Sequence, residues 1–232
     1  TKADQNLYFD LSKVASSDEN HHFLLLSDTQ IQNEFEANQL LTVAAPDVKR
    51  TIQEINDPNI FGIGCGDLVF DRLELFKEYN QSVQLYDIPF FQVLGNHDMD
   101  FGVRSDDWSN QTFKGHFGPT YYSWNRGELH YVVLDDVFYL GNSNKYIGYI
   151  PEEQLAWLEQ DLTQVEKGKT VVVALHIPTF TGAVNRYPDR DVLGGTVSNR
   201  EHLYRLLEGY QVHLLSGHTH FNDNMINGNV YE

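Results

Sequence analysis

Short apolar segments recur along this chain, and polar stretches separate them. They occupy residues 23–26, 60–63, 90–94, 131–134, 171–175 and 212–215. Each segment is shorter than a typical helix and is rich in β-branched, leucine or aromatic residues, a composition that favours buried strands. The pattern therefore predicts a protein whose core is built on short β-strands.

Helical periodicity fills several of the gaps between these segments. We expect helices over residues 46–55, 71–85, 151–165 and 198–207. Pro46 and Pro151 suit first helical positions, where the missing N–H costs no hydrogen bond, and Ser198 with Glu201 has capping-box spacing. Residues 121–134 instead predict a β-hairpin that turns at residues 125–127, where Gly127 supplies the turn. Strands and helices alternate, which indicates an α/β fold with an antiparallel part.

The length and composition fit one folded domain. The chain has 232 residues, of which 41% are hydrophobic and 21% are charged, close to the average for globular proteins. We therefore expect residues 1–232 to form a single domain. Two long loops, at 100–121 and 179–197, are rich in Gly, Asn, Asp and aromatic residues and are where we expect substrate specificity.

Charge and cysteine content narrow the range of partners and cofactors. The formal net charge of −17 argues against bulk nucleic-acid binding, which depends on Lys and Arg neutralising phosphates. Cys65 is the only cysteine, so neither an intrachain disulfide nor a thiolate zinc cluster is possible, and its apolar setting predicts a buried core residue. No apolar run reaches the roughly 18 to 20 residues of a membrane-spanning helix. We expect no membrane insertion and a small-molecule partner.

Polar clusters follow five of the predicted strands directly. They are Ser27-Asp28-Thr29-Gln30, Gly66-Asp67, Gly95-Asn96-His97-Asp98, His176-Ile177-Pro178 and Gly217-His218-Thr219-His220. In open α/β sheets the ligand crevice lies beyond the carboxyl ends of the strands. We therefore expect these clusters to meet at one site.

Several of these clusters offer oxygen ligands for metal ions. The two carboxylate oxygens of Asp67 can bridge two cations, and Asn96 offers a neutral oxygen that suits a hard cation. Taken alone, Gly66-Asp67 also fits an ordinary turn, and Asp28 also fits a cap on the following segment. The assignment of these residues as metal ligands therefore depends on their shared position at the ends of neighbouring strands.

The histidines add nitrogen ligands and a proton donor. His218 and His220, one residue apart at a strand end, can aim imidazoles at two adjacent ions. His176 also ends a predicted strand, although a lone histidine at such a place is often structural. His97 carries a titratable proton, and Asp98 beside it is positioned to orient the ring. The joint pattern favours a metal centre with a general acid.

In their order, these clusters resemble the signature of the calcineurin-like metallophosphoesterase superfamily. That signature reads Asp-x-His, Gly-Asp, Gly-Asn-His-Asp/Glu, His, and Gly-His-x-His, and the match runs from about residue 23 to residue 220. Residues 117–123, the run to Leu134-Asp135 and residues 154–158 are similar to the branch with cyclic-nucleotide phosphodiesterase-like and purple-acid-phosphatase-like domains. The resemblance implies an α/β fold, an αββα sandwich of two mixed β-sheets flanked by helices, with a two-metal centre at one edge.

Carried over residue by residue, the resemblance implies two ion positions that share Asp67. The first ion position would be formed by Asp28, Gln30, Asp67 and His220. The second ion position would be formed by Asp67, Asn96, His176 and His218. We expect two divalent metal ions as cofactors.

Gln30 departs from the family pattern, which has histidine at this place. An amide oxygen is a harder and weaker ligand than imidazole, so we expect Mn²⁺ in the centre, with Mg²⁺, Fe²⁺ and Zn²⁺ as alternatives. Phe70 stands where purple acid phosphatases have the tyrosine that ligates iron. This argues against the purple, redox-active iron subtype.

The implied reaction is metal-assisted hydrolysis of a phosphomonoester or phosphodiester. Two cations about 3.5 to 4 Å apart would bind the phosphoryl oxygens and lower the pKa of a shared water from about 15.7 toward about 7. His97 would protonate the leaving group, and Asp98 would favour the charged form of His97. His97 and Asp98 are thus the candidate catalytic residues.

The competing hypothesis is a binding module on the same fold. If Gln30 prevented an ion from binding at the first ion position, the protein would hold one metal ion or none. It would then be inactive and would only bind a ligand. The other ligand residues and His97 are intact, which argues against this alternative. A phosphoprotein substrate is less favoured, because the sequence shows no docking surface for one.

Other residues are weaker candidates for substrate contacts. They are Arg104, His116, Tyr149, Arg186 and Tyr187, whereas His21 and His22 precede the first strand and are expected to have no catalytic role. Only 12 residues follow His220, where related folds continue the second sheet, so we expect missing final strands or a truncated domain, with possible flanking domains. An excised extracytoplasmic enzyme would fit, although the sequence leaves localisation open.

Overall fold

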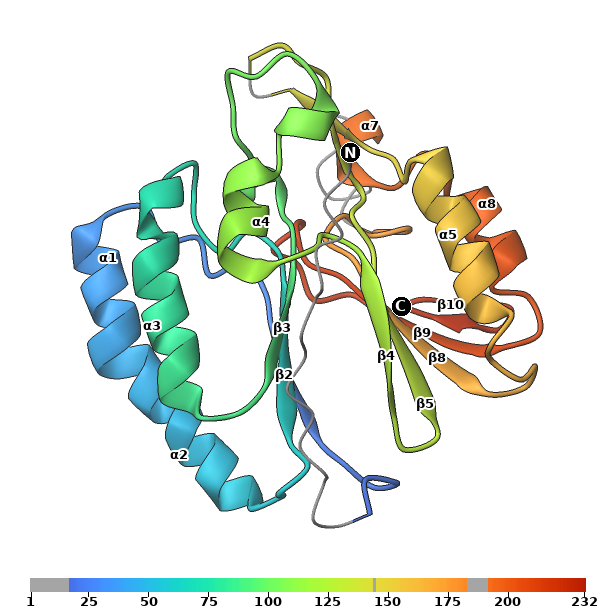
Figure 1. The fold of residues 1–232 in the computed structure, drawn as a ribbon, viewed down its shortest axis with the longest axis horizontal. Helices are drawn as coiled ribbons and strands as arrows, with labels where there is room; N and C mark the ends of the chain where they lie inside the picture. The colour runs from blue at the N-terminus through green and yellow to red at the C-terminus, as the bar shows by residue number, and fades with distance from the viewer. Residues whose placement is uncertain (1–16, 144, 183–191) are drawn as a thin grey trace, which may run out of the picture.

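Two β-sheets lie between two groups of helices (Figure 1). The protein is described by a computed structural model that covers residues 17–143, 145–182 and 192–232. The first sheet has the order β1-β2-β3 and the second has the order β10-β11-β9-β8-β5-β4. The expected αββα arrangement is confirmed, except that the first sheet is parallel throughout and only the second is mixed.

The first sheet is formed by parallel strands whose carboxyl ends lie together. Its strands are β1 (Phe23–Leu26), β2 (Phe61–Cys65) and β3 (Phe90–Val93). Leu26 lies opposite Gly64, and Cys65 lies opposite Val93. This register brings the three polar segments that follow these strands to one edge of the sheet.

The second sheet contributes the other two ligand-bearing strand ends. Its strands are β4 (Tyr122–Arg126), β5 (Leu129–Val133), β8 (Thr170–Ala174), β9 (Gln211–Leu215), β10 (Ile226–Asn227) and β11 (Val230–Tyr231). β4 and β5 form the expected hairpin, with Arg126 opposite Leu129 and Gly127 in the left-handed region at a φ of 53°. Ala174 lies opposite Leu215, so His176 and His218 follow neighbouring parallel strands.

Helices cover the outer face of each sheet. α1 (Glu34–Gln39), α2 (Ala45–Ile55) and α3 (Phe76–Tyr86) lie against the first sheet, and α5 (Glu152–Leu162) and α8 (Arg200–Leu206) lie against the second (Figure 1). Ile52 of α2 and Tyr86 of α3 are buried together with Ile60, which precedes β2. Within the described part of the chain, no helix combines the length and the apolar character that crossing a membrane requires.

The helix expected over residues 46–55 is present as α2, with Pro46 in its first turn. It continues an earlier helix, because the chain is already helical from Glu34, where the Asn33 side chain accepts the N–H of Glu36. A π-helical segment (Leu40–Ala44) precedes Pro46, and Ala45 donates its N–H to Leu40 five residues back. This wider turn keeps the chain helical up to a proline that cannot donate a backbone hydrogen bond. The helix expected from residue 71 begins only at Phe76.

The capping box expected at Ser198 is absent. α8 begins later, at Arg200 with Asn199 as its N-cap residue. The Ser198 hydroxyl donates instead to the carbonyl of Gly148 at 2.8 Å, and Asn199 bonds to Ile150. These side chains therefore bind the start of α8 to residues 148–150 rather than cap the helix.

Short elements occupy the regions expected to be loops. α4 (Gln111–Phe117) lies within residues 100–121, and α7 (Val192–Gly195) lies within residues 179–197. β6 (Val137–Tyr139) and β7 (Tyr146–Gly148) form a separate hairpin. β10 and β11 follow the last histidine cluster and extend the second sheet.

The two sheets pack through an aromatic interface. Phe61 of β2 meets Tyr131 of β5 edge to face at 5.2 Å between ring centroids, and Trp124 of β4 stacks on Tyr131 at 5.1 Å. Such pairs stabilise a fold by about 0.5–1.5 kcal/mol each beyond the burial of their area. Cys65 is fully buried here, as expected from its sequence setting. The interface fixes the distance between the sheets whose ends carry the polar clusters.

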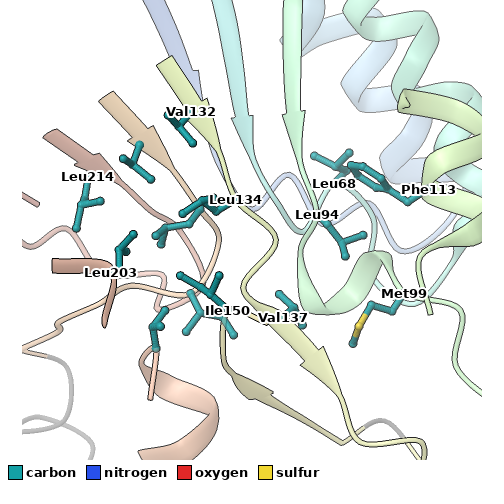
Figure 2. Close-up of a cluster of buried hydrophobic side chains, with 14 of the residues drawn as sticks. Leu68, Leu94, Met99, Phe113, Val132, Leu134, Val137, Ile150, Leu203 and Leu214 are labelled. Atoms are coloured by element: carbon teal, nitrogen blue, oxygen red, sulfur yellow. The ribbon is translucent and has the colours of Figure 1, made fainter. Parts of the chain in front are cut away.

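A second buried cluster runs beneath these strand ends. Figure 2 shows Leu214 and Leu134 of the second sheet on one side and Leu68 and Leu94 of the first sheet's loops on the other, with Val137 between them. Leu134, Leu68 and Leu94 are each 1% exposed or less. The loops that carry the polar clusters therefore pack on one continuous cluster of buried hydrophobic side chains.

Candidate metal centre

Hydrogen bonds from backbone N–H groups join four of the five polar clusters directly, and His97 of the fifth cluster donates its N–H to the carboxylate of Asp67. Asp28 donates its N–H to Gly66 at 3.1 Å, and Gln30 donates to the carbonyl of Asp67 at 2.9 Å. Gly217 donates to the carbonyl of His176 at 3.0 Å, and His218 donates to the carboxylate of Asp28 at 3.1 Å. The structure therefore brings together strand ends from both sheets, as expected.

The backbone is strained at these same positions. Asp28, Gln30, Asp67, His218 and His220 all have positive φ values, between 44° and 70°. Residues other than glycine rarely adopt this left-handed region, and each costs on the order of 1–3 kcal/mol where the surroundings enforce it. Concentrated strain of this kind is typical of functional sites, because it aims side chains that a relaxed strand end would direct elsewhere.

Two glycines allow the clusters to approach so closely. A Cβ on Gly95 would lie 2.0 Å from the backbone nitrogen of Asp67, and a Cβ on Gly66 would lie 2.4 Å from Nδ1 of His176. Neither distance leaves room for a side chain. The glycines that precede Asp67 and Asn96 are thus required by the close packing around the carboxylate of Asp67.

The residues of the second ion position are buried and in contact. Nε2 of His176 lies 3.2 Å from Oδ1 of Asp67 and 3.1 Å from Oδ1 of Asn96. His176, Asp67 and Asn96 are 0%, 1% and 3% exposed. Ligand atoms of Asp67, His176 and His218 all lie within 4.8 Å of one another, close enough to share one ion.

The residues of the first ion position lie on the other side of Asp67. Ligand atoms of Asp28, Asp67 and His220 are also within 4.8 Å of one another, and Nε2 of His220 lies 3.3 Å from Oδ1 of Asp28. Gln30 joins this group through its amide nitrogen, which donates to Oδ2 of Asp67 at 2.8 Å. All seven predicted ligands are therefore brought together around Asp67.

His176 and Asp67 change each other's pKa values. Burial lowers the pKa of His176, but the charge and hydrogen bond of Asp67 outweigh this and raise that pKa to about 10. Burial raises the pKa of Asp67, yet the charge of His176 holds it well below its usual range. A proton on His176 thus supplies positive charge beside the carboxylate of Asp67.

The histidines of the second ion position present defined ring nitrogens. Nδ1 of His176 lies 2.8 Å from the carbonyl of Cys65, which leaves Nε2 facing the site. Burial and the charge of His176 lower the pKa of His218 to about 3, so the His218 ring is neutral. Its Nε2 donates to the carbonyl of Gly194 at 2.9 Å, which leaves Nδ1 free as a ligand.

His97 lies beside the two ion positions and faces Asp67. Its Nε2 is 4.0 Å from Oδ2 of Asp67, and its backbone N–H donates to Oδ1 of Asp67 at 2.9 Å. The ring stacks on Phe70, with 3.8 Å between centroids. Phe70, which stands where purple acid phosphatases have an iron-ligating tyrosine, therefore supports the imidazole of His97 here.

The expected pairing of Asp98 with His97 is wrong. Asp98 is fully buried and accepts the N–H groups of Leu68, Val69 and Gly95, so both of its carboxylate oxygens point away from the imidazole. The carboxylate on Nδ1 of His97 belongs to Asp71, at 2.7 Å. Asp98 instead fixes the backbone of the two clusters that surround it, and burial raises its pKa to about 8.

Sequence reasoning also missed Asp136, which holds the loop of His176. Oδ1 of Asp136 accepts the N–H of His176 at 3.1 Å, and Oδ2 accepts the N–H of Ile177 at 3.0 Å. Asp136 is fully buried, and burial raises its pKa to about 7. The signal in the sequence is a second acidic residue directly after Leu134-Asp135, at the end of another strand.

The weaker candidates fall into structural contacts or outside the described residues. His116 packs against Phe76, the hydroxyl of Tyr149 lies 3.3 Å from Glu152, and Arg104 is exposed. His21 contacts Tyr131 and His22 contacts Asp57. Arg186 and Tyr187 lie outside the described residues.

An open cleft of about 610 Å³ borders the first ion position. Its walls include Asp28, Gln30 and His220 together with further hydroxyl, amide, carboxylate and aromatic residues, among them Gln32, Glu36, Ser216, Phe221 and Asn222. Among its described lining residues there is no lysine or arginine. The cleft gives a small polar molecule access to the centre.

The donor set fits two divalent cations that share Asp67. Each position combines carboxylate or amide oxygens with imidazole nitrogen, which suits Mn²⁺, Mg²⁺, Fe²⁺ and Zn²⁺ to different degrees. Only Asp28 and Asp67 carry negative charge among the seven, so two divalent ions would leave the centre positively charged and attractive to a phosphate. The residues present therefore fit a pair of divalent ions.

Known proteins are similar to this chain in sequence. Purple acid phosphatase 13 of Arabidopsis thaliana is 28% identical over 141 residues, which cover 55% of this chain and 23% of that protein. A probable glycerophosphodiester phosphodiesterase of Arcobacter nitrofigilis is 28% identical over 156 residues, covering 63% of this chain and 51% of that protein. The chain thus spans about a quarter to a half of the length of these relatives.

Solved structures share the fold. A dimetal phosphatase from Danio rerio matches 90% of this chain and 85% of its own, with 16% identity and a TM-score of 0.62. Phosphopantetheinyl hydrolase from Mycobacterium tuberculosis matches 92% of this chain and 88% of its own, with 14% identity and a TM-score of 0.54. The model of the calcineurin-like phosphoesterase family matches residues 21–222, a range that contains every ligand residue described above. The chain therefore belongs to the calcineurin-like phosphoesterase family.

Proposed function

We propose that this protein is a metal-dependent hydrolase of small phosphate esters. The single observation that carries the proposal is the position of Asp67, which joins two groups of metal ligands and lies beside the imidazole of His97. A shared carboxylate would hold two ions close together, and a pair of ions can stabilise both the attacking and the leaving oxygen of an in-line displacement at phosphorus. Membership of a phosphoesterase family supports the same reaction.

The two ions, when bound, would polarise the phosphoryl group and supply hydroxide at neutral pH. The residues of the chain hold the donors in place for this chemistry. Asp67 and His176 are fixed by burial, and Asp136 and the carbonyl of Cys65 fix His176 from both sides. A preformed arrangement of this kind needs little reorganisation during the reaction.

His97 is the proposed general acid. Its Nδ1 is held by Asp71, so the proton on Nε2 points toward Asp67 and the site. A leaving alkoxide beside Asp67 would take this proton, an effect of about 10²- to 10⁴-fold in rate. Asp98 has no direct part in this step and acts through the backbone of the cluster.

The cleft beside the first ion position supports a small, polar substrate. It is lined by amides, hydroxyls and the carboxylates of Asp28 and Glu36. The named relatives include both a phosphatase and a probable phosphodiesterase, so we propose a phosphomonoester or a phosphodiester as the substrate. Mn²⁺ is the favoured metal, because Gln30 and Asn96 offer neutral oxygens to the two positions.

Turnover of two chromogenic esters tests this function. The purified protein is stripped with a chelator and reloaded with Mn²⁺, and the release of p-nitrophenol is followed from p-nitrophenyl phosphate and from bis-p-nitrophenyl phosphate. We expect turnover of at least one ester that requires the metal and that falls sharply in Asp67→Asn. If neither ester is turned over by protein that demonstrably carries metal, the result favours the alternative of an inactive ligand-binding module.

A further inference from the structure

We propose that the two ion positions fill in order, the second ion position binding tightly and the first binding a weakly held, exchangeable ion that limits activity. This inference rests on the proposed two-metal function and adds which residues set the order. Three features of the structure lead to it: the burial of the donors, the hydrogen bond of Gln30, and the wall of the cleft.

The second ion position is already assembled. His176, Asp67 and Asn96 are buried and lie within about hydrogen-bond distance of one another, at 3.1–3.2 Å. A backbone carbonyl accepts a ring N–H from each of the two histidines of this position, His176 and His218. An ion entering here needs no side chain to move far, and hydrogen bonds that hold the ligand rings in place favour tight binding.

The first ion position is open by comparison. The side chain of His220 is 50% exposed, against 13% for Asp28 and 2% for Asp67. A half-exposed imidazole loses conformational entropy when it is fixed to an ion. This cost is absent for His176, which is held on both ring nitrogens in the fully buried site.

Gln30 lowers the affinity of the first ion position further. Its Nε2 donates to Oδ2 of Asp67 at 2.8 Å, the oxygen on the side of the first position. For Gln30 to act as a ligand, its amide must turn so that Oε1 replaces Nε2, and the hydrogen bond to Asp67 must break. Even after turning, an amide oxygen is a weaker ligand than imidazole for most transition metals.

The cleft gives the first ion position a route to solution. Asp28, Gln30 and His220 line it, whereas Asn96 and His176 of the second ion position are buried. An ion at the first position can therefore enter and leave through the cleft. Exposure, ligand type and the Gln30 hydrogen bond all place the weaker affinity at the first position.

Metal titration of the chelator-stripped protein tests the order. Binding of Mn²⁺ is followed by isothermal titration calorimetry, and bound metal is counted after equilibrium dialysis at increasing free Mn²⁺. We expect two separate steps whose dissociation constants differ by at least about tenfold, with the weaker step lost in His220→Ala and the tighter step retained. Two equal steps, or loss of the tighter step in His220→Ala, would overturn the proposal.

Gln30→His is the decisive variant, and Gln32→His is its matched control. The first substitution should tighten the weaker step by about 10- to 100-fold and leave the tighter step unchanged. Gln32 is exposed and lines the same cleft, so histidine there should leave both steps as in the original protein. An unchanged weaker step in Gln30→His, in protein whose melting temperature shows that it is folded, contradicts the assigned role of Gln30.

The outcome is separable from that of the proposed function. Ordered filling is measured by bound metal alone, and it stands or falls whatever the turnover of the test esters. If the function also holds, turnover should reach half its maximum at the free Mn²⁺ concentration of the weaker step. Full turnover at one bound ion would overturn the claim that the exchangeable ion limits activity.

Discussion

Nδ1 of His97 lies 2.7 Å from Oδ1 of Asp71, and the two residues face each other across the turn that follows Asp67. Asp71 is in the left-handed region at a φ of 57°, which turns its carboxylate back toward the imidazole. Phe70 stacks on the same ring. The imidazole is therefore held by two consecutive residues, one on its edge and one on its face, with Nε2 directed at the centre.

Asp71→Asn should reduce turnover while the protein keeps its metal and its stability. Asparagine cannot balance the charge of the imidazolium, so part of the general-acid effect should be lost, about 10- to 100-fold in kcat. The measurement is kcat with a poorly acidic alcohol as leaving group, which depends on protonation. Little change with that ester would mean that Asp71 does not position the proton donor.

Asp98→Asn should behave in the opposite way. Asp98 accepts three backbone N–H groups in the interior, and an amide nitrogen placed among them would leave donors facing donors. We expect a loss of about 1–3 kcal/mol in the free energy of unfolding, measured by urea denaturation. A stable Asp98→Asn protein with a selective loss of kcat would restore Asp98 as the partner of His97.

His97→Asn should remove the proton donor without disturbing the ions. His97 is not among the residues of either ion position, and asparagine is small enough to fit beneath Phe70. We expect kcat to fall by about 10²- to 10⁴-fold with bound metal unchanged by elemental analysis. Loss of metal in this variant would show that His97 is a ligand and that the role given to it is wrong.

Gly95→Ala should disrupt the centre, and Gly115→Ala provides the control. A Cβ at residue 95 would lie 2.0 Å from the nitrogen of Asp67 and 2.3 Å from its Oδ1, so the carboxylate must move. A Cβ at Gly115, in α4, meets no atom within 4 Å, and alanine there should stabilise the helix by about 0.5–1 kcal/mol. Thermal unfolding and Mn²⁺ affinity of both variants check this contrast.

The carboxyl group of Asp135, which is partly buried, makes the stability of the protein depend on pH. Burial and the nearby Asp106 raise the pKa of Asp135 to about 7, whereas an unfolded chain has an ordinary value of about 3.9. The folded state therefore binds the proton more tightly, and the stability gained from it is complete below about pH 4 and is lost as the pH rises through 7.

Asp135→Asn isolates this contribution. Between pH 4 and 7, which are about the two pKa values above, the chelator-treated original protein should lose up to about 1.4 kcal/mol of unfolding free energy per pH unit through this group. The variant should show a correspondingly shallower slope in urea denaturation. Parallel slopes in the two proteins would show that Asp135 is ionised in the folded state.

The predictable part of the fold and site comes from local sequence signals. Apolar runs mark β1, β3, β8 and β9 to within a residue or two, and the polar clusters after them contain the predicted ligands. Parallel strands end at one edge of a sheet, so the meeting of Asp28, Asp67 and Asn96 follows from the parallel first sheet, whereas the approach of His176 depends on how the two sheets pack. The strands and the polar clusters at their ends depend on local residue patterns and on the alternation of strands and helices. Both can be recognised in a single sequence.

The features that the sequence did not predict depend on backbone angles for which the sequence carries no recognisable pattern. Asp98 is adjacent to His97 in sequence, but a short 3-10 turn (Asn96–Asp98) folds its carboxylate back onto Gly95. Asp71 is distant in sequence and reaches His97 only because its φ is positive. The π-helical segment before Pro46 likewise depends on how one helix accommodates a missing donor.

Anomalous diffraction from a crystal grown in excess Mn²⁺ tests the central claim most directly. The account predicts two manganese peaks about 3.5 to 4 Å apart, one on each side of Asp67, with Asn96, His176 and His218 around one and Asp28, Gln30 and His220 around the other. A phosphate bound across both peaks would show the substrate position. No peak among these side chains, or a single peak that persists at saturating manganese, would contradict the two-metal account.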